Sequence, residues 1–255
     1  MVGELAPTPV SAHVTIRPIV APTELVGVNA LFQQIWGTSE PIVQVDLLRA
    51  IGYTGGYVAG AYDTGPNGEH LVGASFGFLA DHDGERALHS HITGILPGVQ
   101  HAGVGRALKD HQRAWAAERG IAWITWTFDP LVRRNAWFNI EVLGAHVAEY
   151  VVDFYGEMHD SVNTGMASDR LVMAWPTSER IERIERIEPG TLRSGVEVPT
   201  PDDIVVLRRT DPTAADEWRL RLRSELGDRL TAGARVTGFT RAGAYVLTDV
   251  AGGPA

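Results

Sequence analysis

The chain has 255 residues, of which 44% are hydrophobic and 21% are charged, a composition typical of a folded globular protein. Its formal net charge of −9 argues against a general nucleic-acid binder, which needs a basic surface, but not against a small anionic ligand held locally. The absence of cysteine excludes disulfides, cysteine metal ligands and a cysteine nucleophile.

The predicted elements follow one another closely from the N-terminus to about residue 175. Strands are predicted at 14–19, 56–63, 70–80, 87–96, 122–130, 145–156 and 169–175. Helices are predicted at 22–37, 43–56, 103–120 and 131–144, most of them ending at a glycine. This order implies an α/β (α+β) fold with a mixed sheet and helices on both faces.

The composition changes after Trp175, and the rest of the chain reads as an appendage. The repeat RIERIERIE (180–188) cannot offer one apolar helix face, so we interpret 177–199 as a solvated linker between a core at 1–176 and an extension at 200–255. In the extension, Asp211 and Pro212 predict the start of a helix. Its packing stripe recurs every four residues, at Trp218, Leu222, Leu226 and Leu230. One or two strands follow within 234–249. A piece of about 50 residues rarely folds alone, so we expect it to pack on the core.

No run of about 18 apolar residues predicts a membrane span, and residues 1–20 lack the basic start and long apolar block of a signal peptide. We therefore expect a cytoplasmic protein that binds neither membrane nor nucleic acid. The oligomeric state stays open, with a homodimer as one option.

A glycine-rich loop joins the predicted strand 87–96 to the predicted helix 103–120. It contains Gln100-x-x-Gly103-x-Gly105 and follows Pro97 and Gly98, which bend the end of the strand. Glycines let a ligand approach the backbone, and the first turn of the helix offers unpaired N–H groups and a positive dipole end. The loop is either a simple turn or a pyrophosphate site.

This loop resembles the pyrophosphate-binding motif Gln/Arg-x-x-Gly-x-Gly/Ala of the GNAT superfamily of acyl-CoA-dependent N-acyltransferases. ILPGVQ (95–100) is similar to the segment before that motif, and RNAWFNIEVLGA (134–145) resembles the family's Asn-x-x-Ala…Leu-Gly-Phe helix. The resemblance covers residues 14–175. It implies a GNAT-like, mostly antiparallel sheet, here with a small C-terminal α/β extension. The segments NAWFN, FYG and SDRLVMAW narrow it to a little-described bacterial branch with such an extension, in which some members N-acylate or N-succinylate amino acids.

The resemblance also implies the residues that bind acetyl-CoA or another acyl-CoA as co-substrate. In this interpretation the backbone of 101–106 binds the pyrophosphate and the strand backbone of 95–99 binds the pantetheine arm. Asn135 lies near the pantetheine or the sulfur. The cofactor-binding candidates are Ile95, Leu96, Val99, Gln100, His101, Ala102, Gly103, Val104, Gly105, Arg106, Asn135 and Asn139. One position departs from the family pattern: Ile140 stands where a tyrosine often serves as general acid for the departing thiolate.

Two histidines lie on the predicted strand before the loop. Because strand side chains alternate, we expect His89, His91, Thr93 and Ile95 on one face and Leu88, Ser90, Ile92 and Gly94 on the other. A polar face on a strand that should be covered on both sides predicts a cavity. His91 lies four residues before Ile95, where many GNAT members have a glutamate that takes the amine proton. Histidine can do the same work, with His89 in a lesser role, or both can be structural.

Further candidates are Asp129 and Tyr155. Asp129 is either a second base or a cap for the helix that follows it. Tyr155 is either the missing acid or an ordinary packing residue. His-x-His could also bind a metal with Asp81, His82 or Asp83, but the spacing fixes no third ligand and we predict no metal site.

These observations predict an N-acyltransferase in which the amine of a small molecule, such as an amino acid, attacks the acyl-CoA thioester directly. A backbone N–H near Ile95 to Leu96 would stabilise the oxyanion. A non-catalytic module that binds acyl-CoA or a partner is the main alternative, supported by the missing tyrosine. A metal-dependent hydrolase built on the histidines is the third.

Overall fold

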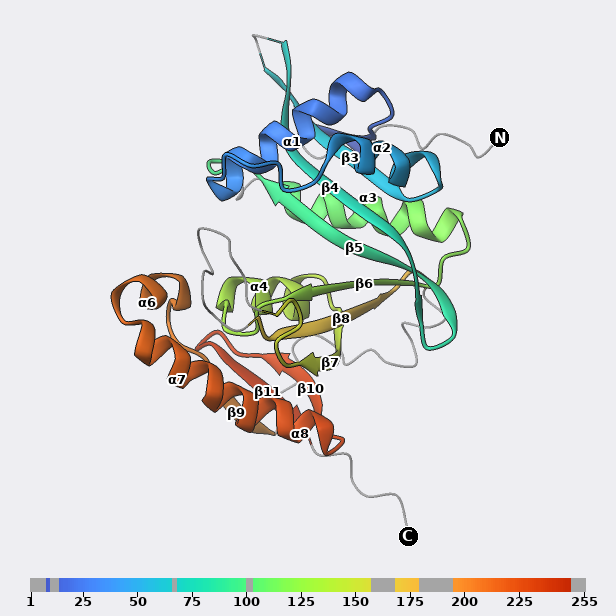
Figure 1. Ribbon diagram of the computed structural model, residues 1–255. Helices are drawn as coiled ribbons and strands as arrows, with labels where there is room; N and C mark the ends of the chain where they lie inside the picture. Colours follow the sequence, from blue (N-terminus) through green and yellow to red (C-terminus); the bar gives the residue numbers. More distant parts are fainter. Residues whose placement is uncertain are drawn as a thin grey trace. The chain divides into compact units, whose positions relative to one another are not determined.

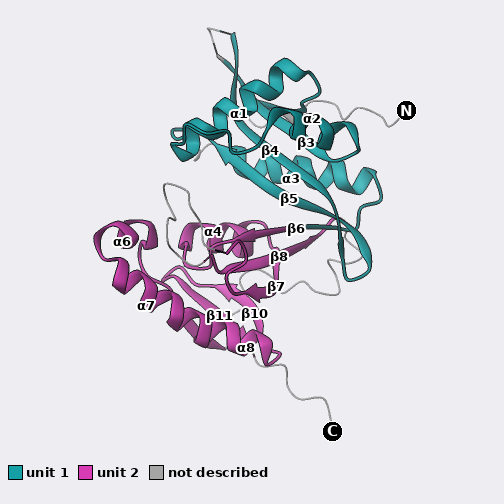
Figure 2. Ribbon diagram, in the orientation of Figure 1, with its two compact units in different colours: residues 1–125 teal, residues 126–255 magenta. Residues whose placement is uncertain are grey.

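A computed structural model describes residues 8–9, 14–65, 68–99, 103–156, 168–178 and 195–248. The chain forms two compact units, residues 1–125 and residues 126–255 (Figure 2). The boundary between the units lies inside one strand, β6 (Trp123–Phe128). The compact units therefore divide the chain earlier than the predicted core boundary at residue 176. The described part of the chain holds no helix long and apolar enough to span a membrane.

The described residues of the first unit form strands and the helices α1, α2 and α3 (Figure 1). Its strands before β6 are β1 (Thr8–Pro9), β2 (Val14–Pro18), β3 (Tyr57–Gly65), β4 (Gly68–His82) and β5 (Glu85–Ile95). Its helices are α1 (Pro22–Trp36), α2 (Val45–Tyr53) and α3 (Val104–Glu118). The strand order is β1-β2-β3-β4-β5-β6, antiparallel throughout except for the parallel pair of β5 with β6.

Helices cover both faces of this sheet. Phe32 and Val28 of α1 and Leu48 of α2 are fully buried and share a cluster with Phe76 of β4. On the other face, Leu108 of α3 is fully buried and lies beside β4 at Gly73. Pro22 in the first turn of α1 and Gly37 after its last residue, at φ 63°, set the ends of that helix as the sequence predicts.

The second unit combines the end of β6 with helical and strand segments. They are α4 (Arg133–Trp137), η1 (Phe138–Val142), β7 (His146–Val151), β8 (Arg170–Pro176), β9 (Val196–Pro199), α6 (Ile204–Thr210), α7 (Pro212–Leu222), η2 (Arg223–Gly227), α8 (Asp228–Thr231), β10 (Arg235–Phe239) and β11 (Ala244–Thr248). One sheet continues in the order β6-β8-β7, and a second has the order β10-β11-β9. The segments η1 and η2 are π-helical turns that extend α4 and α7.

Within this unit, residues from 195 onward pack against the residues between β6 and β7. The Tyr245 hydroxyl donates to Pro130 O at 2.7 Å, and the Phe239 N–H donates to Glu141 Oε1 at 2.7 Å. The predicted stripe of the C-terminal helix is present, because Leu222 and Leu226 are buried and Trp218 and Leu230 are half-buried. Asp211 caps α7 by accepting from the Ala214 N–H, as predicted.

The predicted fold class is confirmed: a mixed, mostly antiparallel sheet with helices on both faces, and a small additional sheet with its own helices. Three details differ. Val196–Pro199, expected in the linker, form β9, an edge strand on which Pro199 is tolerated. Ile204–Thr210, where no element is predicted, form a helix capped by Asp203. β7 ends at Val151, ahead of a turn in which Asp153 has φ 56°. The repeat 180–188 lies outside the described residues.

Candidate active site

A β-bulge shapes β5 at its two histidines. Phe76 of β4 pairs with Ile92, but the next residue, Gly77, pairs with Ser90, so His91 is the extra residue on β5. A bulge shifts the side-chain alternation by one position. The predicted faces are therefore right for His89 and His91 but wrong beyond them.

The structure separates Thr93 and Ile95 from the histidines. The Thr93 hydroxyl lies 2.8 Å from Ser75 Oγ, which in turn accepts from Gln112 of α3, so Thr93 faces α3. Ile95 lies on that same face, beside Leu108 at Gly73. Ile92, expected opposite His91, packs instead against the cluster that includes α1 and α2.

His91 opens onto a cavity of about 530 Å³ in the first unit. The other lining residues come from the segment before α2, from α2 and from β4: Pro41, Ile42, Val43, Gln44, Leu47, Ile51, Phe76 and Phe78. The His91 ring contacts Phe76 edge-on at 5.4 Å between centroids and Phe78 at 5.6 Å. Burial lowers the pKa of His91, so its imidazole is neutral at pH 7 and can accept a proton.

His89 is held more firmly than His91. Its Nδ1 lies 3.1 Å from Thr125 Oγ1, and its ring packs on Phe78. Burial lowers the pKa of His89 to about 4, with smaller contributions from the charges of His91 and Lys109. A neutral, hydrogen-bonded imidazole beside His91, with centroids 6.1 Å apart, suits a positioning role.

The strand ends in a tight turn rather than running on to Val99. β5 stops at Ile95, and the Val99 N–H donates to Leu96 O at 3.3 Å across Pro97 and Gly98. Pro in the second position and Gly at φ 98° in the third favour a type II turn. The Leu96 N–H donates to Val72 O at 2.9 Å, so it is not available to an oxyanion, and Ile95 is the only strand residue of the predicted 95–99 segment.

The predicted pyrophosphate loop leads into a 15-residue helix. Gln100, His101 and Ala102 lie outside the described residues. Gly103 is the N-cap of α3 with φ 78°, and a Cβ placed there would meet no atom within 4 Å. Val104, Gly105 and Arg106 form the first turn, whose N–H groups have no acceptor within the helix. This open, positive helix end fits a pyrophosphate. The Arg106 guanidinium pairs with Asp110 at 2.8 Å.

A buried polar network behind β5 is not predicted from the sequence. Lys109, the only lysine of the chain, is buried on α3 and donates to Ser90 Oγ at 2.8 Å and to Gln112 Oε1 at 3.4 Å. Burial lowers its pKa to about 7. His111 of the same helix is 3% exposed and bonds to the Tyr57 hydroxyl at 2.8 Å. The signal that could have revealed the network is the run of polar residues at 109, 111 and 112 on the face that carries Leu108.

Asp129 and Tyr155 both belong to the second unit. Asp129 Oδ1 accepts from the Leu131 N–H at 3.0 Å, and Oδ2 forms an ion pair with Arg208. Both carboxylate oxygens are therefore occupied, which argues against a base. The capping interpretation is wrong as well, because the N-cap of α4 is Val132 and no side chain caps that helix. Tyr155 lies in the turn after β7, is 44% exposed, and its hydroxyl is 3.2 Å from Thr127 Oγ1.

The two predicted asparagines have different surroundings. Asn135 is exposed on α4. Asn139 is buried in η1, where its Oδ1 accepts from Trp126 Nε1 at 3.2 Å and its backbone O accepts from the Ala145 N–H. Asn139 thus anchors the π-helical turn to β6. Ile140, at the position of the family's tyrosine, is half-buried beside it.

The described part of the chain contains no cluster of three or more His, Asp or Glu residues arranged to hold a metal ion. His82 contacts Asp83 at 3.8 Å and packs on Trp123, away from any third donor of that kind. The metal-dependent interpretation therefore has no ligand set among these residues.

Comparisons with known proteins find the fold but no close relative. No family model and no curated protein matches the chain. Solved structures do match: nearly the whole length of each aligns with about two thirds of this chain. The ribosomal-protein-S5-alanine acetyltransferase of Vibrio fischeri has TM-score 0.53 and 13% identity over 68% of this chain and 98% of its own. The ribosomal-protein-S18-alanine N-acetyltransferase of Escherichia coli has TM-score 0.50 and 18% identity over 71% and 99%.

A third similar structure, Arabidopsis thaliana NAA60 in complex with acetyl-CoA, has TM-score 0.50 and 12% identity over 64% of this chain and 98% of its own. Identities of this size establish architecture rather than activity. The element order, the helices on both faces of the sheet and these similarities together show that the chain has the fold of the GNAT acetyltransferases.

Proposed function

We propose that the protein transfers an acyl group from acyl-CoA to the amine of a small molecule. The observation that carries this proposal is the position of His91, which lines an apolar cavity on the same strand that leads, through one turn, into the loop before α3. A proton acceptor, an acceptor cavity and a candidate pyrophosphate site thus belong to one compact unit.

The acyl-CoA side of the reaction would rest on the start of α3. The backbone N–H groups of 103–106 would bind the pyrophosphate, since Gly103 leaves the approach open. The pantetheine arm would lie along β5 near Ile95. Parallel pairing with β6 covers only Ala87–His89, although β5 continues for six more residues. The thioester that acyl-CoA supplies would then lie near the bulge.

The reaction requires a group on this chain that accepts the proton of the amine. The amine nitrogen forms a bond to the acyl carbon, the carbon–sulfur bond breaks, and the nitrogen gives up a proton. Neutral His91 would accept that proton directly or through a water molecule. The thiolate would take a proton from solvent, because Ile140 stands at the position of the family's tyrosine and cannot donate one.

The cavity also indicates the kind of amine. Seven of its nine lining side chains are apolar, none is a carboxylate, and Gln44 and His91 are the two polar members. A polyamine would need acidic partners, whereas an apolar side chain would be buried favourably. We therefore favour an amine with an apolar body, such as a hydrophobic amino acid.

The non-catalytic alternative is the same fold binding acyl-CoA without turnover. The missing tyrosine favours it, while a neutral histidine at the wall of a cavity favours catalysis. A binder would retain acyl-CoA affinity and release no thiol in the presence of any amine, so one assay separates the two.

The test is thiol release from a panel of acetyl-, propionyl- and succinyl-CoA with amines. Leucine and phenylalanine are compared with aspartate, spermidine and an alanine-initiated peptide, the last because similar structures are named as alanine acetyltransferases. Because the protein has no cysteine, a thiol reagent reports only CoA. We expect turnover with an apolar amino acid above all others. Release no faster than spontaneous hydrolysis with every amine would contradict the proposal.

A further inference from the structure

The second unit brings together four arginine side chains from four of its elements. Arg170 lies on β8, Arg208 on α6, Arg219 on α7 and Arg223 on η2. Burial lowers the pKa of Arg170. The charges of Asp129 and Tyr155 raise this pKa, and the charges of Arg219 and Arg208 lower it. These groups are therefore close enough to feel one another's charge.

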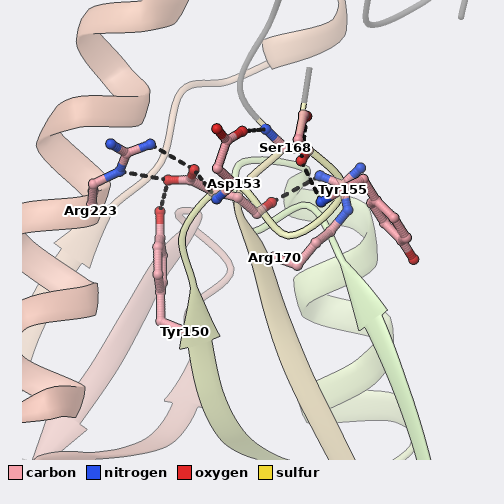
Figure 3. A network of polar contacts seen from close by, with 8 residues as sticks. Tyr150, Asp153, Tyr155, Ser168, Arg170 and Arg223 are labelled. Atoms are coloured by element: carbon pink, nitrogen blue, oxygen red, sulfur yellow. Dashed lines mark hydrogen bonds and ion pairs between the residues drawn. The ribbon is translucent and has the colours of Figure 1, made fainter. Parts of the chain in front are cut away.

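Two carboxylates of the described residues lie within this arginine cluster, and each is already engaged. Arg223 donates two hydrogen bonds to Asp169, from Nη2 to Oδ1 at 2.7 Å and from Nε to Oδ2 at 3.0 Å. The Tyr150 hydroxyl donates to Asp169 Oδ2 at 2.7 Å (Figure 3). Asp129 is the ion-pair partner of Arg208. The charge of a third carboxylate, Asp153, also acts on Arg223.

Arg219 carries the strongest sign of a ligand. Its side chain is 3% exposed, and its Nε and Nη1 atoms have no hydrogen-bond acceptor among the described residues. A buried guanidinium without acceptors is costly, because its charge has lost water and gained nothing in return. Nε and Nη1 lie on different edges of the guanidinium, and an oxygen of a carboxylate or a phosphate could accept from either of them.

We propose that the arginine cluster is a binding site for a small oxyanion, a carboxylate or phosphate group that accepts a hydrogen bond from Arg219, with Arg170 and Arg208 beside it. The site lies wholly in the second unit and does not depend on the activity proposed for the first. Its ligand supplies the acceptor that the Nε and Nη1 atoms of Arg219 lack among the described residues.

The cluster also has an exposed edge through which a ligand could enter. Arg170 is half-buried and its guanidinium lies over the ring of Tyr155 at 5.2 Å from the centroid, as Figure 3 shows for the two side chains. Tyr155 is 44% exposed. A small anion could therefore reach Arg219 past this pair without unfolding the unit.

The experiment measures the Tm of the full-length protein with increasing disodium succinate, sodium acetate or sodium phosphate, each against sodium chloride at equal ionic strength. Succinate and acetate test a carboxylate, and phosphate tests a phosphoryl group. A ligand of the folded state should raise Tm by about 2–4 °C at roughly five times its Kd. Equal Tm in all four salts would overturn the proposal.

Substitutions then locate the site. Arg219→Met should abolish the anion-specific shift and raise Tm in chloride, because it removes a buried charge that lacks acceptors. Arg221→Met, an exposed arginine of the same helix paired with Glu225, should retain the full shift. If Arg219→Met does not fold, Arg170→Gln should weaken the anion by about tenfold or more. An anion shift that survives in the folded Arg219 or Arg170 variant would place the ion elsewhere and overturn the proposal.

Discussion

His91 owes its position to a single extra residue in β5. Without the bulge, strict alternation would put Thr93 and Ile95 on the face of His91. With the bulge, Ile92 lies on that face and packs against the cluster that includes α1 and α2. The sequence indicates the histidines as polar residues in a covered strand. It cannot indicate the bulge, because Ser90-His91-Ile92 contains no glycine or proline to mark an irregularity.

The role of His91 can be tested by its removal. His91→Ala should lower kcat/KM by about 10²–10⁴-fold, the usual contribution of a positioned acid–base group, and leave acyl-CoA affinity nearly unchanged. Raising the pH should partly restore activity, since more of the amine is then neutral without help. Any loss of wild-type kcat/KM that comes from protonation of His91 should appear only below pH 6.5, because burial lowers the pKa of His91.

His70→Ala, an exposed histidine of β4, serves as the control and should behave as wild type. The measurement is a pH–rate profile for each protein beside its melting curve. A folded His91→Ala protein with wild-type kcat/KM at every pH would remove His91 from the mechanism.

At the scale of elements, α3 has two roles. Its first turn contains Gly105 of the predicted pyrophosphate motif, and its inner face carries Lys109, His111 and Gln112, which form hydrogen bonds with β3, β4 and β5. These bonds pin the helix to the strand that bears His91. A sequence pattern predicts the helix from its glycine start and apolar stripe, yet it cannot show that its polar residues find partners inside.

The buried Lys109 predicts an unusual pH dependence of stability. Its folded pKa of about 7 lies below the unfolded value of 10.5, so between these pH values the unfolded chain binds the extra proton. Stability should therefore rise as the pH increases from 7 to 9, by a few degrees in Tm, and this gain should be lost as the pH falls back.

Lys109→Met should flatten that rise, whereas Arg106→Met, which removes an exposed cation of the same helix, should keep it. Differential scanning calorimetry of the three proteins checks the prediction. A Lys109→Met protein whose Tm climbs as steeply as wild type would show that the ammonium keeps its charge on folding.

The same comparison explains which elements the sequence reveals. The sequence predicts α1 and α7 because each has a proline in its first turn, and Asp211 is an additional cap signal for α7. β9 and α6 are harder to predict, because VEVP ends in a proline and IVVL begins with three β-branched residues. β9 is stabilised by pairing with β11, a tertiary contact, whereas α6 begins at the local cap Asp203.

At the scale of the whole molecule, the net charge is negative although two cationic side chains are buried. The chain carries −9 overall, yet its buried polar groups include Lys109 in the first unit and Arg219 in the second. A negative net charge is therefore compatible with local sites for anions. Composition alone predicts neither buried cation, because each depends on which face its helix turns inward.

Everything proposed for catalysis lies in residues 1–125, so the central claim reduces to whether that unit binds acyl-CoA at the start of α3. Gly103→Glu places a side chain and a negative charge at the helix N-cap, where the pyrophosphate should lie. Gly120→Glu is the matched control at the other end of the helix, with φ 62° against 78° and equally open space around it.

The measurement is isothermal titration calorimetry of acetyl-CoA into wild type and both variants, each first shown to melt cooperatively. The account predicts that wild type and Gly120→Glu bind alike and that Gly103→Glu loses about 100-fold or more in affinity. Equal affinity in all three folded proteins, or no binding to wild type, would contradict it.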